Sequence, residues 1–499
     1  MKGRTVVAPG AKGGWEKRAG AAATRRLLCR RLALAAILLA GLLALLGRIP
    51  AVAHLAEKGG DAASSAGPAP PLCGQRDDRK VHVPADWNTF RPPRVGQSYI
   101  DPVFGCRVTR LTDSSAAEPL PDGRHPGLVH YYSTWSPLNA GDSLLLIAAL
   151  NGAWRIIDTK AQTVIAPTAM PAMNNGHPVW DAANGSVFYY ARGEALYRGT
   201  VNGRSVDSAE LHRFQEYQGV ISPDAADLSQ DGDHIALVGE RADRRLDIFV
   251  WSLRQQAKTS LYTTTCESAG SIIATQQPGC VHKLQLTADN LLSIQFAQDG
   301  SGPEQGVRLW DGHALVHWQD ATNHYDTGED FQGRPVFIAV GNASTLAGLQ
   351  NSCRSGWGLE VRRQDEVPSA ACLLDHAPAW HVSYRGGPSQ PWAALSFFDT
   401  RAQGPEYFSQ DARFEAPSSE NWPLYEDEIV LASVDGSAVY RLAQARSRSA
   451  ESYWSQPHAA ISRDGRYVVF TSNMAHPDGC PANMLAAQEC TDVYLIQVR

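Results

Sequence analysis

The sequence predicts an all-β protein, and within that class a seven-bladed β-propeller. Short runs of β-branched and aromatic residues alternate with turn signals from about residue 81 onward, and stretches with helical periodicity are rare. These runs group into four-stranded units at intervals of about 40–50 residues, which is the period of propeller blades. Glycine (43) and proline (30) are plentiful, as many short strands joined by turns require.

The N-terminus, residues 1–53, is predicted to be a targeting segment. Arg30 and Arg31 precede the apolar run Leu32–Gly47, and Ala51–Ala53 has the small-residue pattern of a cleavage site. The run is shorter than the roughly 20 residues that a membrane-spanning helix prefers. A cleaved secretory signal and an uncleaved anchor helix formed by residues 32–47 both remain open interpretations.

In both interpretations the rest of the chain lies in the periplasm or outside the cell. Residues 54–72 are small, polar and proline-rich, so we expect a flexible linker over residues 54–80. The propeller is then expected to occupy residues 81–499, with membrane contact only through the N-terminal segment.

The cysteines agree with export. Cys29 belongs to the targeting segment, and eight cysteines follow it, an even number that predicts disulfide bonds. The simplest pairing closes four local loops: Cys73–Cys106, Cys266–Cys280, Cys353–Cys372 and Cys480–Cys490. Scattered buried thiols are the alternative, and a zinc site is disfavoured because no C-x-x-C motif is present.

Seven units can be counted, and the last has only three strands. Its fourth strand is expected to be Cys106–Asp113, which precedes the first unit. A ring closed by strands from both ends of the chain leaves no unpaired edge. Six or eight blades would follow if the long insertions before His282 and between Thr400 and Leu424 were misassigned. A β-sandwich combined with a β-barrel is the alternative fold.

Six histidines stand where the first strand of a unit is expected to begin. Equivalent positions of successive blades meet near the propeller axis, so we expect these imidazoles to converge. Neutral imidazole is a common metal ligand and a general base near neutral pH. In the third unit, Asp224 and Asp227 take the place of a histidine. The six are His130, His177, His282, His324, His381 and His458.

A resemblance becomes visible in the last unit. The turn Ser462–Gly465, the apolar strand Tyr467–Asn473 and the closing strand Asp492–Tyr494 resemble the propeller repeat of TolB-type periplasmic proteins. The segment as a whole is similar to the last blade of the oligogalacturonate lyases, which are seven-bladed propellers. This resemblance implies a divalent metal, usually manganese, held by a glutamine and a histidine before such a strand and by a histidine of an earlier blade.

Gln456 and His458 stand in such places. The family's other histidine, two positions before His458, is replaced here by Gln456, and the family's glutamine would fall at Tyr453. From the resemblance we expect His324, His381, Gln456 and His458 to bind a divalent metal ion, Mn²⁺ or Ca²⁺.

The chemistry of a lyase assigns the remaining roles. Cleavage of a polyuronide by β-elimination removes the proton α to a carboxylate, and a metal ion or an arginine stabilises the charge that develops. We expect His130 or His177 to be the base and Arg385 to bind the substrate carboxylate. The structural alternative for each histidine is a hydrogen bond to a neighbouring backbone carbonyl.

The expected function is therefore that of a carbohydrate-active propeller, a metal-assisted lyase of an acidic polysaccharide or oligosaccharide. The alternative is a non-catalytic TolB-like propeller that binds a ligand or an envelope protein. A formal net charge of −6 argues against a nucleic-acid partner, which requires a basic face. The sequence contains no G-x-S-x-G elbow, phosphate loop or H-E-x-x-H motif.

Overall fold

A computed structural model describes residues 70–499 except 162, 166–175, 223–226, 268–278, 321–323, 343–351, 366–369, 377–380, 398–401, 404–412, 415–417, 419, 449–451, 475–479 and 486–488. The predicted targeting segment and most of the predicted linker lie outside these residues. No helix within the described residues is long and apolar enough to cross a membrane.

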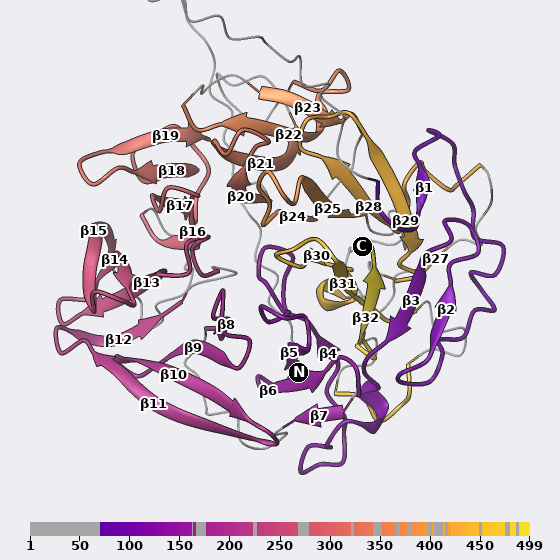
Figure 1. The fold of residues 1–499 in the computed structure, drawn as a ribbon, viewed down its shortest axis with the longest axis horizontal. Helices are drawn as coiled ribbons and strands as arrows, with labels where there is room; N and C mark the ends of the chain where they lie inside the picture. Colours follow the sequence, from indigo (N-terminus) through magenta and orange to yellow (C-terminus); the bar gives the residue numbers. More distant parts are fainter. Residues whose placement is uncertain are drawn as a thin grey trace, which may run out of the picture. The chain divides into compact units, whose positions relative to one another are not determined.

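Seven antiparallel sheets make up most of the described part of the chain and are arranged as the blades of a ring (Figure 1). Blade 1 contains β4 (Leu128–Val129), β5 (Leu144–Ala149), β6 (Trp154–Asp158) and β7 (Thr163–Ile165). Blade 2 contains β8 (Val179–Trp180), β9 (Val187–Arg192), β10 (Ala195–Asn202) and β11 (Ser205–Arg213). Blade 3 contains β12 (Tyr217–Ile221), β13 (His234–Arg241), β14 (Arg245–Ser252) and β15 (Ala257–Glu267).

The next two blades follow the same order. Blade 4 contains β16 (Val281–Leu286), β17 (Leu292–Phe296), β18 (Val307–Trp310) and β19 (Leu315–Gln319). Blade 5 contains β20 (Tyr325–Glu329), β21 (Pro335–Asn342), β22 (Trp357–Arg363) and β23 (Ala370–Leu374). The seven-bladed propeller predicted from the sequence is confirmed, and the sandwich-plus-barrel alternative is wrong.

The last two blades each take additional strands from the N-terminal part of the described chain. Blade 6 contains β24 (His381–Ser383), β25 (Trp392–Ser396), β28 (Glu428–Ser433), β29 (Val439–Gln444) and β1 (Gln75–Arg76). Blade 7 contains β30 (Ala460–Ile461), β31 (Tyr467–Ser472), β32 (Asp492–Gln497), β3 (Arg107–Arg110) and β2 (Ser98–Ile100). A separate pair is formed by β26 (Ala402–Gln403) and β27 (Arg413–Phe414), and two 3-10 turns are Ser114–Ala116 and Tyr453–Ser455.

Ring closure occurs where the sequence predicted it. Strand β3 lies within Cys106–Asp113 and pairs antiparallel with β32, so that Val108 faces Ile496 and Arg110 faces Tyr494. Strand β1 lies inside the predicted linker, residues 54–80, and pairs with β29. The C-terminal end of that predicted linker is therefore part of a blade.

The expected first strand of the third unit is shifted. The strand in that place is β12 (Tyr217–Ile221), which ends before Asp227, and Asp224 lies outside the described residues. Two histidine placements also differ from the expectation. His130 directly follows β4, and His282 lies inside β16.

The core is divided among the interfaces between adjacent blades. Trp135 and Trp180 pack between blades 1 and 2, and Trp318 packs with Phe337 between blades 4 and 5. Trp392 of blade 6 packs against blade 7. Each buried aromatic or aliphatic side chain contributes about 1.5–3 kcal/mol relative to exposure, so apolar contacts hold adjacent blades together around the axis.

All four predicted disulfides are present, which confirms the proposed pairing. They join Cys73 to Cys106, Cys266 to Cys280, Cys353 to Cys372 and Cys480 to Cys490. Disulfides form and persist in oxidising compartments. The bonds therefore indicate a periplasmic or extracellular protein.

Candidate functional site

A histidine centre lies at one end of the inner strands of blades 5, 6 and 7. The rings of His381 and His458 are 4.1 Å apart, centroid to centroid, and those of His324 and His381 are 4.6 Å apart and stacked. His130 reaches the same place from blade 1, because its Nε2 lies 2.7 Å from the backbone oxygen of His458. Four of the six predicted imidazoles therefore converge.

The strands explain this convergence. His324 immediately precedes β20, His381 is the first residue of β24, and His458 lies two residues before β30. These inner strands lie side by side around the middle of the ring (Figure 1). His458 has a φ of 47°, in the left-handed region that non-glycine residues seldom adopt, and such backbone strain is concentrated at functional sites.

Tyr132 completes the centre. Its ring centroid lies 5.2 Å from that of His458, 5.5 Å from that of His381 and 6.2 Å from that of His324. The side chain is 8% exposed. A phenol hydroxyl both donates and accepts hydrogen bonds, so Tyr132 adds a group capable of proton transfer to the aromatic surroundings of the imidazoles.

Several polar atoms at this centre have no hydrogen-bond partner among the described residues. They are both ring nitrogens of His381, the Nε2 atom of His458 and both amide atoms of Gln456. All three side chains are at most 1% exposed. A buried polar group left unsatisfied costs about 1–3 kcal/mol, and such a group in a native protein calls for water or an ion as its partner.

His130 differs from its neighbours because both of its ring nitrogens are engaged. Nδ1 lies 2.9 Å from Oγ1 of Thr471, and Nε2 contacts the backbone oxygen of His458. This side chain therefore fixes the backbone of His458, as the structural alternative for these histidines supposed.

Burial keeps the central imidazoles neutral. It lowers the pKa of His130 to about 4, and the hydrogen bond to the backbone oxygen of His458 opposes this shift only in part. Burial, followed by the nearby imidazoles, lowers the pKa of His381 and of His458 well below 6.5. Neutral rings keep a lone pair, which is the form that binds metals.

The other two predicted histidines have different surroundings. His282 is exposed and lies at the register shift between Val281 and Lys283, where it has no paired residue in β17. His177 is buried and packs against Tyr131 and Trp135, with ring centroids 5.3 and 5.8 Å away. Aromatic rings link it to the centre, since Tyr131 contacts Trp454 and Trp454 contacts His458.

The histidines by themselves are not arranged as a metal-binding site. Within the described residues, no group of three or more His, Cys, Asp or Glu side chains is already arranged to hold a metal ion. The donor chemistry nevertheless suits one, because the neighbouring imidazoles of His381 and His458 have unsatisfied nitrogens, and the buried amide of Gln456, two residues before His458, is also unsatisfied. Gln456 would add its amide oxygen to the imidazole nitrogens.

Arg385 lies in a second group, which we call the axial ion network. Its Nε atom is 3.2 Å from Oδ2 of Asp227, and its Nη1 atom is 3.2 Å from Oδ1 of Asp326. Arg463 approaches the same Asp227 with its Nη2 atom 3.1 Å from Oδ1. Gln285 donates to Oδ1 of Asp326 at 2.9 Å. The network thus joins blades 4, 5, 6 and 7 to the segment that follows β12.

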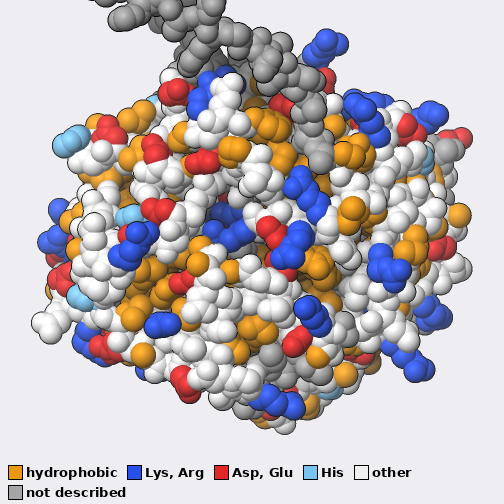
Figure 2. Space-filling view, in the orientation of Figure 1, with side chains coloured by type: hydrophobic (Ala, Val, Ile, Leu, Met, Phe, Trp, Pro, Cys, Tyr) orange, Lys and Arg blue, Asp and Glu red, His pale blue; other side chains and the backbone are white. Residues whose placement is uncertain are grey.

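The two carboxylates of the axial ion network titrate differently. Burial raises the pKa of Asp227, but Arg463 and Arg385 together outweigh burial, and the net shift is downward. At Asp326 burial outweighs the attraction of Arg385 and Lys283 and raises the pKa to about 6. Figure 2 shows Lys and Arg side chains in the hollow at the middle of the face that it presents.

The sequence did not reveal this network, because the partners lie in blades far apart in the chain. Asp227 stood out only as the residue that replaced a histidine, and Arg463 only as part of a turn. One sequence feature could have indicated the network. An arginine follows the inner strand in two successive units, at positions 385 and 463.

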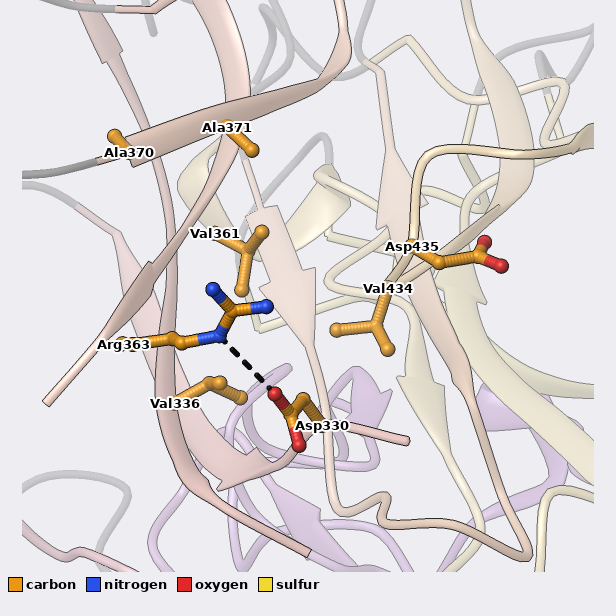
Figure 3. Close-up of a pocket in the computed structure, with 8 residues that line it drawn as sticks. All are labelled: Asp330, Val336, Val361, Arg363, Ala370, Ala371, Val434 and Asp435. Atoms are coloured by element: carbon orange, nitrogen blue, oxygen red, sulfur yellow. Dashed lines mark hydrogen bonds and ion pairs between the residues drawn. The ribbon is translucent and has the colours of Figure 1, made fainter. Parts of the chain in front are cut away.

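A separate pocket of about 290 Å³ lies between blades 5 and 6 (Figure 3). Its charged lining residues are Asp330, Arg363 and Asp435, and Arg363 is 3.2 Å from Asp330. None of the histidines of the centre lines it. Because Asp330 and Arg363 pair with each other and the remaining walls are mostly valine and alanine side chains, the pocket offers little chemistry.

No protein-family model matches the chain, and no curated protein matches it. Solved structures with a similar fold include an oligogalacturonate lyase from Vibrio parahaemolyticus, with 9% identity, a TM-score of 0.48 and coverage of 81% of this chain and 96% of that one. The WD40 domain of Neurospora crassa Pan2 matches at 10% identity and a TM-score of 0.42, covering 81% of this chain and 98% of its own.

Hydrazine synthase from Kuenenia stuttgartiensis matches at 12% identity and a TM-score of 0.38, covering 70% of this chain and 93% of its own. All three matches have TM-scores below 0.5 and identities of 12% or less, so no activity is transferred from them to this chain. The sheet order within the chain itself is what establishes the seven blades.

Proposed function

We propose that the protein binds one divalent metal ion at the histidine centre and is a lyase that cleaves an acidic polysaccharide or oligosaccharide by β-elimination. One observation carries this proposal. Two nitrogens of His381, one of His458 and the amide of Gln456 are all buried without hydrogen-bond partners in the described part of the chain. Their desolvation is costly unless something binds them.

The ligand set would consist of His324, His381, His458 and Gln456. The ring of His381 lies 4.1 Å from that of His458 and 4.6 Å from that of His324, centroid to centroid, so the three imidazoles that would hold the ion are neighbours. Of the two ions expected from the sequence, Mn²⁺ suits this set better than Ca²⁺, because Ca²⁺ takes only oxygen ligands.

When bound, the metal would neutralise the carboxylate of a uronate and stabilise the charge that develops next to it. The residues around it supply the proton transfers. The base removes the proton α to the carboxylate, the bond from the β carbon to the glycosidic oxygen breaks, a carbon–carbon double bond forms, and the leaving oxygen gains a proton.

Tyr132 is the group best placed to move these protons, since its ring contacts three of the four imidazoles. His177 is a second candidate base and would act from its place beside Tyr131 and Trp135. We assign His130 a positioning role, because both of its nitrogens are occupied by Thr471 and the backbone of His458. Arg385 is held by two carboxylates, so we do not assign it to the reacting sugar.

The test is product formation from uronate polymers such as polygalacturonate and ulvan, followed by the ultraviolet absorbance of the new conjugated double bond. We expect activity that EDTA removes and Mn²⁺ restores, and loss of activity in His381→Ala. His282→Ala is the matched control, because this exposed histidine lies away from the core, and it should retain activity. Folded protein that carries Mn²⁺ but gives no product with any uronate polymer would overturn the lyase assignment.

The competing function is that of a non-catalytic scaffold that binds a ligand or a protein. The burial of the histidine centre favours it, because a polymer has little access to buried side chains. His130, His381 and Gln456 are all 0% exposed. Tyr453 is 38% exposed, and its ring centroid lies 5.0 Å from that of His458, so a polymer would approach the centre beside Tyr453. A folded protein that binds no divalent ion and forms no unsaturated product would favour this second function.

A further inference from the structure

The two ends of the inner strands carry different chemistry. In blade 6, His381 begins β24 and Arg385 follows that strand, and in blade 7, His458 precedes β30 and Arg463 follows it. A strand rises about 3.3 Å per residue, so the four residues from His381 to Arg385 span roughly 13 Å. The two arginines therefore lie toward the opposite end of the inner strands from the histidine centre.

Each carboxylate of the axial ion network is shared between two cations. Arg385 and Arg463 both pair with Asp227. Arg385 also pairs with Asp326, whose charge is stabilised by Lys283 as well. The arginines are therefore only partly neutralised by these two carboxylates.

The arginines also have unused donors. Nη2 of Arg385 and Nε of Arg463 are buried and have no hydrogen-bond partner among the residues that the structure describes. The side chain of Arg385 is 9% exposed and that of Arg463 is 20% exposed. These two donor atoms are thus shielded from bulk water, while the Arg463 side chain as a whole is partly exposed.

Both arginines bind the same carboxylate. Arg385 contacts Oδ2 of Asp227, and Arg463 contacts Oδ1, so two like-charged groups are held close together. The guanidinium group presents a planar set of N–H donors that matches the geometry of carboxylate, phosphate and sulfate. An additional anion would satisfy the unused donors and reduce the repulsion between the two arginines.

We propose that Arg385 and Arg463 form a binding site for a small oxyanion at the end of the inner strands remote from the histidine centre. This site goes beyond the proposed function and does not depend on it, since it requires no metal and no reaction. The ligand class is a compact oxyanion, which is either a free inorganic ion such as phosphate or the carboxylate of a sugar acid.

The experiment is isothermal titration of EDTA-treated protein with inorganic phosphate in one arm and glucuronate in the other, at low ionic strength. We expect saturable binding in at least one arm. Stronger binding of phosphate identifies a free inorganic anion, and stronger binding of glucuronate identifies a sugar acid. Binding in neither arm overturns the proposal.

Arg463→Gln tests the assignment to these residues, because Arg463 is the more exposed of the pair and its loss is better tolerated. We expect at least a tenfold lower affinity. Arg463→Lys keeps the charge but loses the planar donors and should also weaken binding. The matched control is Arg466→Gln, an exposed arginine of the same turn that pairs with Asp142 and Asp464, and it should bind as the wild type does.

Arg385→Gln is the second variant at the proposed site. It removes the cation that pairs with both Asp227 and Asp326, so circular dichroism is used to confirm that the variant is folded. A folded Arg385→Gln protein should also bind the anion more weakly. Wild-type affinity in a folded Arg463→Gln protein would place the anion elsewhere and overturn the proposal, whatever the outcome for Arg385→Gln.

Discussion

The ring of His381, the first residue of β24 in blade 6, lies 4.1 Å from the ring of His458 in blade 7, centroid to centroid. Both are buried, and neither ring nitrogen of His381 has a hydrogen-bond partner among the described residues. In the proposed function, these two neutral imidazoles share one metal ion as their ligand. If the two rings share a ligand, their replacement should abolish metal binding. If they only pack together, it should change stability alone.

Gln456→Leu should have opposite effects on stability and on metal binding. The amide of Gln456 is buried, and no described residue satisfies it. An apolar side chain of similar size should therefore raise the free energy of unfolding of the metal-free protein by about 1–2 kcal/mol. The same change removes a proposed ligand and should weaken Mn²⁺ binding. Urea unfolding in EDTA and titration with Mn²⁺ measure the two effects, and a destabilised metal-free variant would count against this interpretation.

Tyr132→Phe should separate catalysis from metal binding. The phenyl ring keeps the contacts with His381 and His458, but the hydroxyl is lost. We expect unchanged Mn²⁺ content and product formation reduced by about 10²–10⁴-fold, the usual contribution of a positioned acid or base. Undiminished product formation would remove Tyr132 from the proton transfer.

Asp142→Asn should change how stability depends on pH. Burial, followed by repulsion from Asp464, raises the pKa of Asp142 to about 7, against the pull of Arg466. A carboxyl whose folded pKa is raised contributes stability below its unfolded pKa of about 4, and loses that contribution as pH rises through 7. The variant should therefore gain stability relative to the wild type as pH rises from about 4 to about 7. Urea midpoints across this range provide the measurement, and a relative stability that falls with pH would be the wrong sign.

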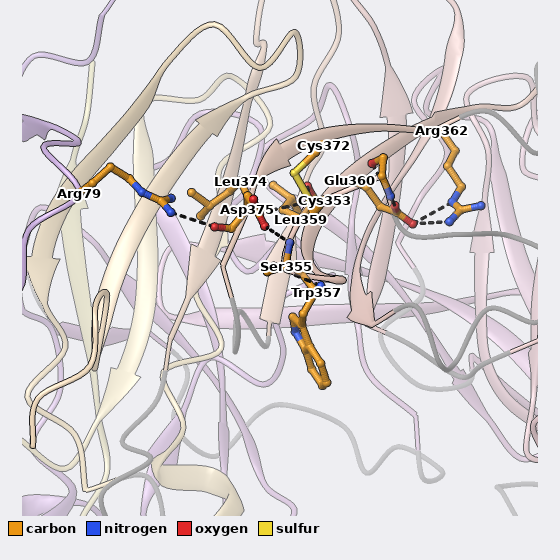
Figure 4. Close-up of a disulfide and its surroundings, with 11 residues drawn as sticks. Arg79, Cys353, Ser355, Trp357, Leu359, Glu360, Arg362, Cys372, Leu374 and Asp375 are labelled. Carbon is orange, nitrogen blue, oxygen red and sulfur yellow. Dashed lines mark hydrogen bonds and ion pairs between the residues drawn. A yellow bond between two sulfur atoms is a disulfide. The ribbon is translucent and has the colours of Figure 1, made fainter.

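The contribution of each disulfide to the free energy of unfolding should increase with the length of the loop that it closes. Cys73–Cys106 spans 33 residues and Cys353–Cys372 spans 19, for which chain entropy gives about 4 and about 3 kcal/mol. Figure 4 shows the second bond beside Ser355 and Asp375, which are joined by a hydrogen bond. Replacing both cysteines of each pair by alanine and measuring chemical unfolding tests which disulfide contributes more. A larger loss of unfolding free energy for the shorter loop would contradict the prediction.

Much of the fold was predictable because each strand and turn has a local sequence pattern, and the spacing of these patterns gives the blade period and the incomplete last blade. The closing strand within Cys106–Asp113 and the four disulfide pairs are confirmed. The inner strand of blade 3 was missed because the sequence placed its start at Asp224 and Asp227, whereas Tyr217–Ile221 lies before them. The exposure of His282 was missed because the register shift between Val281 and Lys283 in β16 has no signal in the local sequence.

The site was predictable only in part. The convergence of His324, His381 and His458 follows from equivalent positions in consecutive blades. The occupied nitrogens of His130 and the pairing of Arg385 with Asp227 depend on contacts between distant parts of the chain. Such contacts have no local signature, so sequence patterns could not assign those roles.

Metal binding at the histidine centre is measured by the metal content of purified protein after exposure to Mn²⁺ and dialysis, compared among wild type, His458→Ala and His282→Ala. We expect about one ion per chain in the wild type and in His282→Ala, because the proposed ligand set holds a single ion. We expect loss of that ion in a folded His458→Ala protein. A wild type without bound metal, or equal metal in all three proteins, would contradict the proposed centre.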